Sequence, residues 1–140
     1  MNLLNFGHAA DNGITIKASG RPVKETMDLL EKAARIHGAT VYVRIDQQSE
    51  AQKNNLKIPP LEYLLFGNPA KGTALLVNYP LIALDLPLKI ICWQDFDGKT
   101  LIGFNNYEYI FRRYGLVANP ESPLNLSNFI DQVVKQTFQD

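Results

Sequence analysis

Spacings of apolar residues define the first two elements of the chain. From Gly13 to Ser19 apolar and polar residues alternate, and this period of two predicts a strand with one buried face. Pro22 suits the first turn of a following helix, where its missing N–H costs no hydrogen bond. Apolar residues then recur at spacings of four, three and four, at Val23, Met27, Leu30 and Ala34. Gly38 predicts the C-terminal end of this helix.

Two more strands are predicted in the next thirty residues. The segment Ala39–Asp46 alternates so that Val41, Val43 and Ile45 would face one way. Residues 47–55 are polar, with room for one or two helical turns. The run Leu61–Phe66 is apolar on both faces except at Glu62, which predicts a strand covered on more than one side.

A hairpin is predicted around Asp97-Gly98, which separates the apolar runs 88–96 and 99–105. An Asp-Gly pair in this setting is typical of a two-residue turn between antiparallel strands. Counting outward from the turn predicts that Cys92 lies opposite Gly103 and Trp93 opposite Ile102. One face of the hairpin would then carry Ile91, Trp93, Ile102 and Phe104.

Capping residues predict three further helices. Asn68 and Pro69 favour a short helix from 69 to about 79, Asn106 caps one at 107–114, and Ser122 begins a last helix at about 123–138. Short connections between most of the strands indicate an α+β fold. We expect a two-layer β-α-β(4)-α arrangement, with a mainly antiparallel sheet and helices on one face. We expect a single domain over residues 1–140.

Charge and cysteine content exclude several partners and compartments. The chain has 14 basic and 14 acidic residues, whereas phosphate-dominated nucleic-acid binding needs a strong positive charge. No apolar run reaches the roughly 20 residues of a membrane helix, and the N-terminus does not resemble a secretory signal. The single cysteine indicates a reducing compartment. We therefore expect a soluble cytoplasmic protein with no nucleic-acid or membrane partner.

Metal-binding and nucleophilic motifs are not apparent. The histidines are His8 and His37, and with Cys92 they form no clustered set of ligands. A Gly-x-Ser-x-Gly nucleophile turn does not occur. We interpret Cys92 as a small core residue of a strand. No metal and no cofactor are expected.

One combination of motifs resembles a known family. The stretch Phe66-Gly67-Asn68-Pro69 with Gly72-Thr73, followed by Asp85-Leu86-Pro87, resembles the bacterial and archaeal family called domain of unknown function 302. Looser similarity covers a core of about residues 13–116. The resemblance implies a fold related to that of the TATA-box-binding protein, often found as a homodimer, and no established activity. Similar sequences usually read Ile-Asp-His after the second strand, where this chain has Gln47.

The segment Gly67–Thr73 is the strongest candidate for a binding site. The N-terminus of a helix offers free N–H groups and a partial positive charge, both of which favour an anion. Asn68, Lys71 and Thr73 add an amide, a cation and a hydroxyl. The alternative is a purely structural turn with Asn68 as the helix cap. The expected ligand is small and either anionic or apolar.

Two acidic residues in apolar surroundings are further candidates. Asp85 and Asp46 must be hydrogen-bonded, paired or shifted in pKa if they are buried. Convergence of Asp46, Asp85 and Asn68, with Gln47 beside Asp46, would form a polar pocket. We favour a non-catalytic binding module over two alternatives. One is an enzyme using Asp46, Asp85 and Lys71 as acid, base or substrate anchor, and the other is a protein–protein interaction module.

A homodimer is expected from the apolar character of both sheet faces. A single helical layer covers one face, and soluble monomers avoid a large exposed apolar patch. A second copy is the commonest cover. The alternatives are an N-terminal or C-terminal segment that folds back, or an apolar ligand. We expect about 1,000 Å² or more to be buried in total, with Leu61–Phe66 or the hairpin in the contact.

Overall fold

The computed structural model describes residues 12–116 and 126–137. Within these ranges the elements follow in the order β1 (Ile14–Ser19), α1 (Val23–Ile36), β2 (Thr40–Asp46), α2 (Gln47–Lys53), β3 (Leu61–Gly67), α3 (Pro69–Asn78), the 3-10 helix η2 (Pro80–Leu84), β4 (Leu88–Gln94), β5 (Thr100–Asn105), α4 (Tyr107–Arg112) and α5 (Leu126–Thr137). His8 and the predicted cap of the last helix at Ser122 lie outside the described residues.

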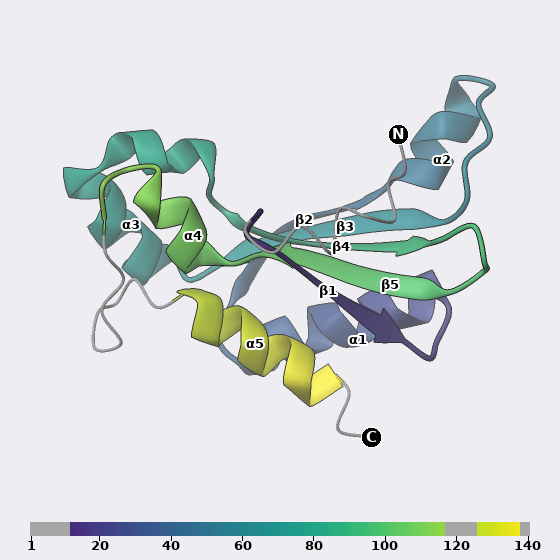
Figure 1. Ribbon diagram of the computed structural model, residues 1–140, viewed down its shortest axis with the longest axis horizontal. Coiled ribbons are helices and arrows are strands. Elements are labelled where there is room, and N and C mark those ends of the chain that lie inside the picture. The colour runs from purple at the N-terminus through teal and green to yellow at the C-terminus, as the bar shows by residue number, and fades with distance from the viewer. Residues whose placement is uncertain (1–11, 117–125, 138–140) are drawn as a thin grey trace.

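The strands form one antiparallel sheet in the order β1-β5-β4-β3-β2. Helices α1 and α5 lie on the same side of this sheet, α3 and α4 gather at one of its ends, and α2 extends from the other end (Figure 1). The predicted α+β fold with its antiparallel sheet is therefore confirmed.

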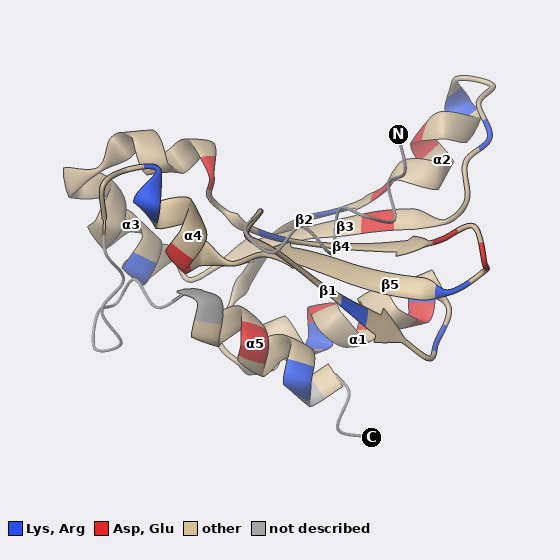
Figure 2. Cartoon of the chain, in the orientation of Figure 1, with Lys and Arg blue, Asp and Glu red and all other residues tan. Residues whose placement is uncertain are grey.

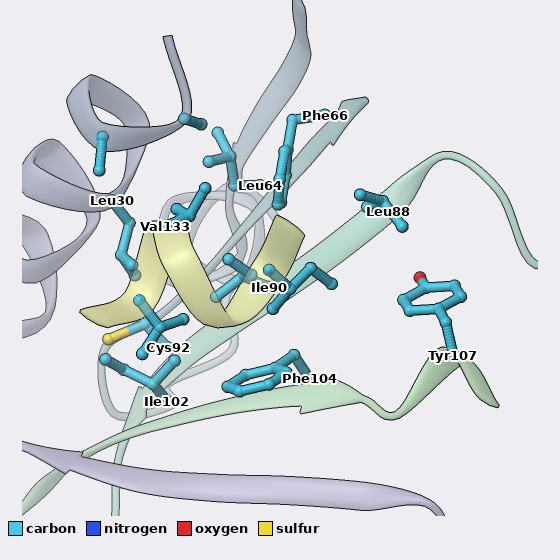
Figure 3. Packing of buried hydrophobic residues seen from close by; sticks show 14 of the residues in the cluster. Leu30, Leu64, Phe66, Leu88, Ile90, Cys92, Ile102, Phe104, Tyr107 and Val133 are labelled. Carbon is cyan, nitrogen blue, oxygen red and sulfur yellow. The ribbon is translucent and has the colours of Figure 1, made fainter. Parts of the chain in front are cut away.

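The core lies between the sheet and the pair α1–α5. Figure 3 shows Leu30 of α1 and Val133 of α5 facing side chains of the three central strands. The strand residues that point into this core are Leu64, Phe66, Leu88, Ile90, Cys92, Ile102 and Phe104. All four apolar positions that predicted α1 are buried, and Gly38 ends the helix with φ of +85°. The helical spacing was therefore a correct guide to the buried face of α1.

The predicted register of the hairpin is wrong by one residue. Cys92 pairs with Ile102, and Trp93 pairs with Leu101. The turn has three residues, because Asp95 pairs with Lys99 and its Oδ1 accepts hydrogen bonds from the amides of Asp97 (2.9 Å) and Lys99 (2.8 Å). Gly98 adopts a φ of +79°, as in three-residue loops with a left-handed residue at their end. Phe96 is consequently a turn residue and is 87% exposed.

This shift changes which residues share a face of the sheet. Ile102 and Phe104 lie with Ile90 and Cys92 in the core, and not with Ile91 and Trp93 as the two-residue turn predicted. Gly103 lies on the opposite face, where a Cβ would be 3.1 Å from Cζ3 of Trp93 and 3.3 Å from Cγ1 of Ile91. The missing side chain thus allows these two neighbours to pack over the strand.

A bulge in β2 overturns a second expectation. Val41 pairs with Phe66 and Val43 with Leu65, so Tyr42 is the extra residue between them. Neighbouring residues of β3 point to opposite faces, so Val41 and Val43 also lie on opposite faces. Val41 packs against the core, while Val43 is 40% exposed.

The sheet face opposite α1 and α5 is mainly apolar. Lys89 lies on it, with its Nζ 5.5 Å from the centroid of the Tyr63 ring. The pairings place the following apolar side chains on it: Ile14, Ile16, Ala18, Val43, Ile45, Leu61, Tyr63, Leu65, Ile91, Trp93 and Leu101. We call this set the open sheet face. Ile14 and Ile16 are 38% and 36% exposed, so the edge of this face is in contact with solvent among the described residues.

Candidate functional site

A cavity of about 370 Å³ lies at the end of the sheet where α3 begins. We call it the α3 cavity. Strand β2, the end of β3, helix α3 and the segment from η2 to β4 each contribute to its wall. The lining residues are Tyr42, Gly67, Asn68, Pro69, Gly72, Thr73, Leu76, Ala83, Leu86, Pro87 and Leu88. The segment Gly67–Thr73, singled out from the sequence, therefore supplies about half of the lining.

Asn68 caps α3 as its sequence position predicts. Its Oδ1 accepts hydrogen bonds from the amides of Ala70 (3.1 Å) and Lys71 (3.2 Å). Its carbonyl oxygen accepts from the amide of Gly72 at 2.9 Å, and Pro69 has no N–H. The amides of the first turn are thus already satisfied, and they leave no backbone donors there for an anion.

Polar groups on the lining are few and uncharged. They are the side chains of Tyr42, Asn68 and Thr73. Asn68 uses only its oxygen in hydrogen bonds, so its Nδ2 has no partner within the described residues. The hydroxyls of Tyr42 and Thr73 also have no hydrogen-bond partner there. An apolar wall with a few unpaired donors and acceptors is the usual composition of a small-molecule site.

Lys71 and Asp85 lie next to the cavity without lining it. Lys71 is exposed on α3. The carboxylate of Asp85 accepts hydrogen bonds from the hydroxyl of Tyr114 and from Nη1 of Arg113, the latter at 3.3 Å. The Tyr114 bond raises the pKa of that phenol, because the carboxylate stabilises its protonated form. Asp85 therefore ties the segment before β4 to the end of α4.

Asp46 and Gln47 lie at the opposite end of the sheet. Asp46 pairs with Glu62 near the start of β3, whereas Asn68 follows the end of that strand. Glu62 and Asn68 are six residues apart along an extended chain, which corresponds to about 20 Å. Asp46 caps α2 through a 2.9 Å bond from the Ser49 amide, and Gln47 accepts from the Tyr63 hydroxyl. The structure therefore does not bring Asp46 and Gln47 together with Asn68 and Asp85.

Sequence reasoning missed Tyr42 and the residues after η2 as parts of the wall. Tyr42 reaches the cavity through the β2 bulge, and its Cε2 would be 3.7 Å from a Cβ at Gly67. Gly72 was included in the segment Gly67–Thr73 but was not used as a signal for the cavity. Gly72 lies inside α3, where glycine costs about 1 kcal/mol relative to alanine. A Cβ at this position would have no atom within 4 Å.

Neither an accessible cysteine nor a metal cluster occurs in the described parts of the chain. Cys92 is fully buried, and this burial raises the pKa of its thiol to about 12. No group of three His, Cys, Asp or Glu residues within 12–116 and 126–137 is placed to hold a metal ion. The helices of these ranges are each too short or too polar to cross a membrane.

Comparison with known families identifies the fold. The model of the family "Domain of unknown function DUF302" matches residues 14–136. The chain belongs to the DUF302 family. The match includes the β3–α3 turn and the Asp85-Leu86-Pro87 segment that carried the resemblance in the sequence. The description of this family assigns no activity to the DUF302 domain.

A solved structure supports the same assignment. The crystal structure of an uncharacterized conserved DUF302 protein from Bacillus stearothermophilus superposes with a TM-score of 0.76. It is 19% identical in sequence, and the alignment covers 89% of this chain and 98% of that chain. At this identity the likeness shows that the two proteins share a fold.

Similarity also extends to parts of longer proteins. The chain is 33% identical over 106 residues to "Fluoride-specific ion channel FluC 1" of Brucella suis biovar 1 (strain 1330) and to the protein of that name from Brucella abortus biovar 1 (strain 9-941). The matched region is 76% of this chain and 42% or 39% of those proteins. The chain thus spans about two fifths of the length of these relatives.

Proposed function

We propose that this DUF302 domain is a non-catalytic module that binds a small molecule in the α3 cavity and acts as a homodimer. The cavity itself carries the proposal. Its volume of about 370 Å³ falls within the range of ligand pockets, and its lining combines apolar walls with three uncharged polar side chains. Of the two ligand types expected from the sequence, an apolar molecule fits this lining better than an anion.

An enzymatic role has less support because its residues are dispersed. Asp46 caps α2 at the far end of the sheet, and Asp85 is engaged by Tyr114 and Arg113. Lys71 does not line the cavity. A general acid, a general base and a substrate anchor must meet at one reacting group, and these three do not.

Fluoride, the ion in the names of the Brucella relatives, is a poor match to this cavity. A small anion requires N–H donors or positive charge to replace its water. The first-turn amides of α3 already donate within the chain, and no cationic side chain lines the wall. The proposal for this chain is therefore a ligand other than fluoride.

Native mass spectrometry of the purified protein tests the binding proposal. We expect part of the wild-type protein to carry a small-molecule mass above that of the 15.8 kDa chain. The Gly72→Leu variant should lose this mass, because the new side chain enters open space at the cavity wall. Ala70→Leu is the matched control, since it enlarges an exposed residue of α3 that does not line the cavity. An added mass that persists in Gly72→Leu would contradict binding at this place.

A further inference from the structure

Gly72 is the unexplained residue of the α3 cavity. Its φ is not in the left-handed region, so its backbone does not require glycine. A side chain there would meet no atom of the described chain within 4 Å, so packing does not require glycine either. One use of glycine is to let a ligand approach the backbone closely, and Gly72 lines the cavity. The space over Gly72 lets a ligand approach the backbone of α3 closely.

The size of the cavity limits the ligand. One water occupies about 30 Å³ in the liquid, so 370 Å³ corresponds to the volume of about a dozen waters, which is room for one small organic molecule. One part of the wall is the aromatic ring of Tyr42, which is half exposed and lies over Gly67. An aromatic ring can gain from offset stacking on another flat ring. A compact bicyclic aromatic molecule fits both the volume and this wall.

The charge of the lining limits the ligand further. Figure 2 shows α3 and η2 almost free of charged residues, and the lining includes none. A carboxylate or ammonium group would lose its water here without gaining an ionic partner. Asn68 Nδ2 and the hydroxyls of Thr73 and Tyr42 are, by contrast, suited to a single neutral polar group.

We infer that the α3 cavity takes a small, uncharged aromatic molecule that carries one hydroxyl or carbonyl group. Its ring system lies between Tyr42 and the open backbone at Gly72, beside the aliphatic wall of Leu76 and Leu86. Its polar group bonds to Asn68 or Thr73. This inference rests on the proposed function and adds the class of ligand to it.

Titration with two naphthalene probes of similar size but different charge tests the inference. 1-Naphthol is neutral near neutral pH, and 1-naphthoate carries an ionised carboxylate in place of the hydroxyl. Binding is followed by amide chemical shifts in two-dimensional NMR of the 140-residue wild type, Gly72→Leu and Ala70→Leu. We expect 1-naphthol to shift residues of the cavity wall and to bind at least about tenfold more tightly than 1-naphthoate, a difference of about 1.4 kcal/mol. Gly72→Leu should weaken 1-naphthol binding at least about tenfold, and Ala70→Leu should leave it unchanged.

The outcomes separate the ligand class from the site. If 1-naphthoate binds as tightly as 1-naphthol and Gly72→Leu weakens both, the inferred class is wrong and the proposed cavity stands. If neither probe shifts the cavity residues, or if Gly72→Leu leaves their binding unchanged, both the class and the site are overturned. Unchanged unfolding midpoints of the two variants would show that lost binding does not come from lost folding.

Discussion

Arg44 illustrates what a single residue contributes that its place in the sequence does not reveal. It lies on β2 next to the bulge and reaches the helix-covered face. Its guanidinium bonds to Glu62 at 2.8 Å, to Asp28 at 2.6 Å and to Glu31 at 3.4 Å. The side chains of Arg44 and Glu62 are only 21% and 10% exposed. Such partners, 13 to 18 residues apart, meet only because α1 packs across the sheet, so the alternation in β2 could not predict them.

Loss of Arg44 should therefore destabilise the fold. We expect Arg44→Met to lower the free energy of unfolding by about 2 kcal/mol, because Glu62 keeps a largely buried charge without its partner. The double variant Arg44→Met/Glu62→Met should recover most of this loss. Urea denaturation measures both, with Lys24→Met as a control: its pair with Asp28 is exposed and should contribute less than about 0.5 kcal/mol. Equal losses in Arg44→Met and Lys24→Met would contradict a structural role for the cluster.

The same cluster sets a pH dependence. The hydrogen bond from Arg44 lowers the pKa of Asp28 below its ordinary value of 3.8. A carboxyl with a lowered folded-state pKa stabilises the fold above its unfolded pKa, and that contribution is lost as the pH falls through the folded value. The stability difference between wild type and Arg44→Met should thus narrow on acidification from neutral pH to below 3.8. Urea midpoints measured across this range would contradict the assignment if the difference stayed constant.

At the scale of elements, caps and helical spacing were reliable, and strand register was not. Asn68 and Asn106 cap α3 and α4 as predicted, since the capping bond depends on neighbouring residues alone. The hairpin failed because two local solutions compete in Asp95-Phe96-Asp97-Gly98-Lys99. The Asp-Gly rule favours a two-residue turn, but the carboxylate of Asp95 holds two amides and adds one residue to the loop. The bulge at Tyr42 could likewise not be predicted, because apolar and polar residues alternate through β2 without interruption.

Asp95 should consequently contribute more to the hairpin than Asp97. Removal of its two hydrogen bonds in Asp95→Ala should lower the free energy of unfolding by about 1 kcal/mol. Asp97→Ala should change it by less than about 0.5 kcal/mol, because its exposed carboxylate makes no hydrogen bond within the described residues. Urea denaturation of both variants measures the difference. The reverse order of effects would favour the two-residue turn and its register.

At the scale of the whole molecule, the sequence predicted that the sheet has a second apolar face, but it did not predict correctly which residues form this open sheet face. Apolar residues at successive positions of β3 and β4 implied that both faces need cover, and α1 with α5 covers one of them. Which hairpin residues lie on the other face depends on the turn, so the shift of one residue changed the set. Of the α3 cavity, the sequence predicted only the segment Gly67–Thr73. Its other walls come from β2 and η2, which the fold brings together over long separations in the sequence.

The open sheet face leads to the proposed dimer and to its test. A second copy packed on this face would bury the apolar side chains around Trp93, and removing this apolar surface from water is favourable. We expect the interface to bury at least about 1,000 Å² in total. We expect wild type to sediment at twice the chain mass at micromolar concentration.

Ile16→Lys and Val43→Lys should weaken association at least about tenfold, since each places a charge at an exposed edge of this face without disturbing the core. Leu84→Lys is the control, at an exposed apolar residue of η2 away from the sheet. Emission of Trp93, the single tryptophan, should shift to longer wavelength as the dimer is diluted. A wild-type monomer at micromolar concentration would refute the dimer, whereas dissociation by Leu84→Lys alone would move the interface from the open sheet face to η2.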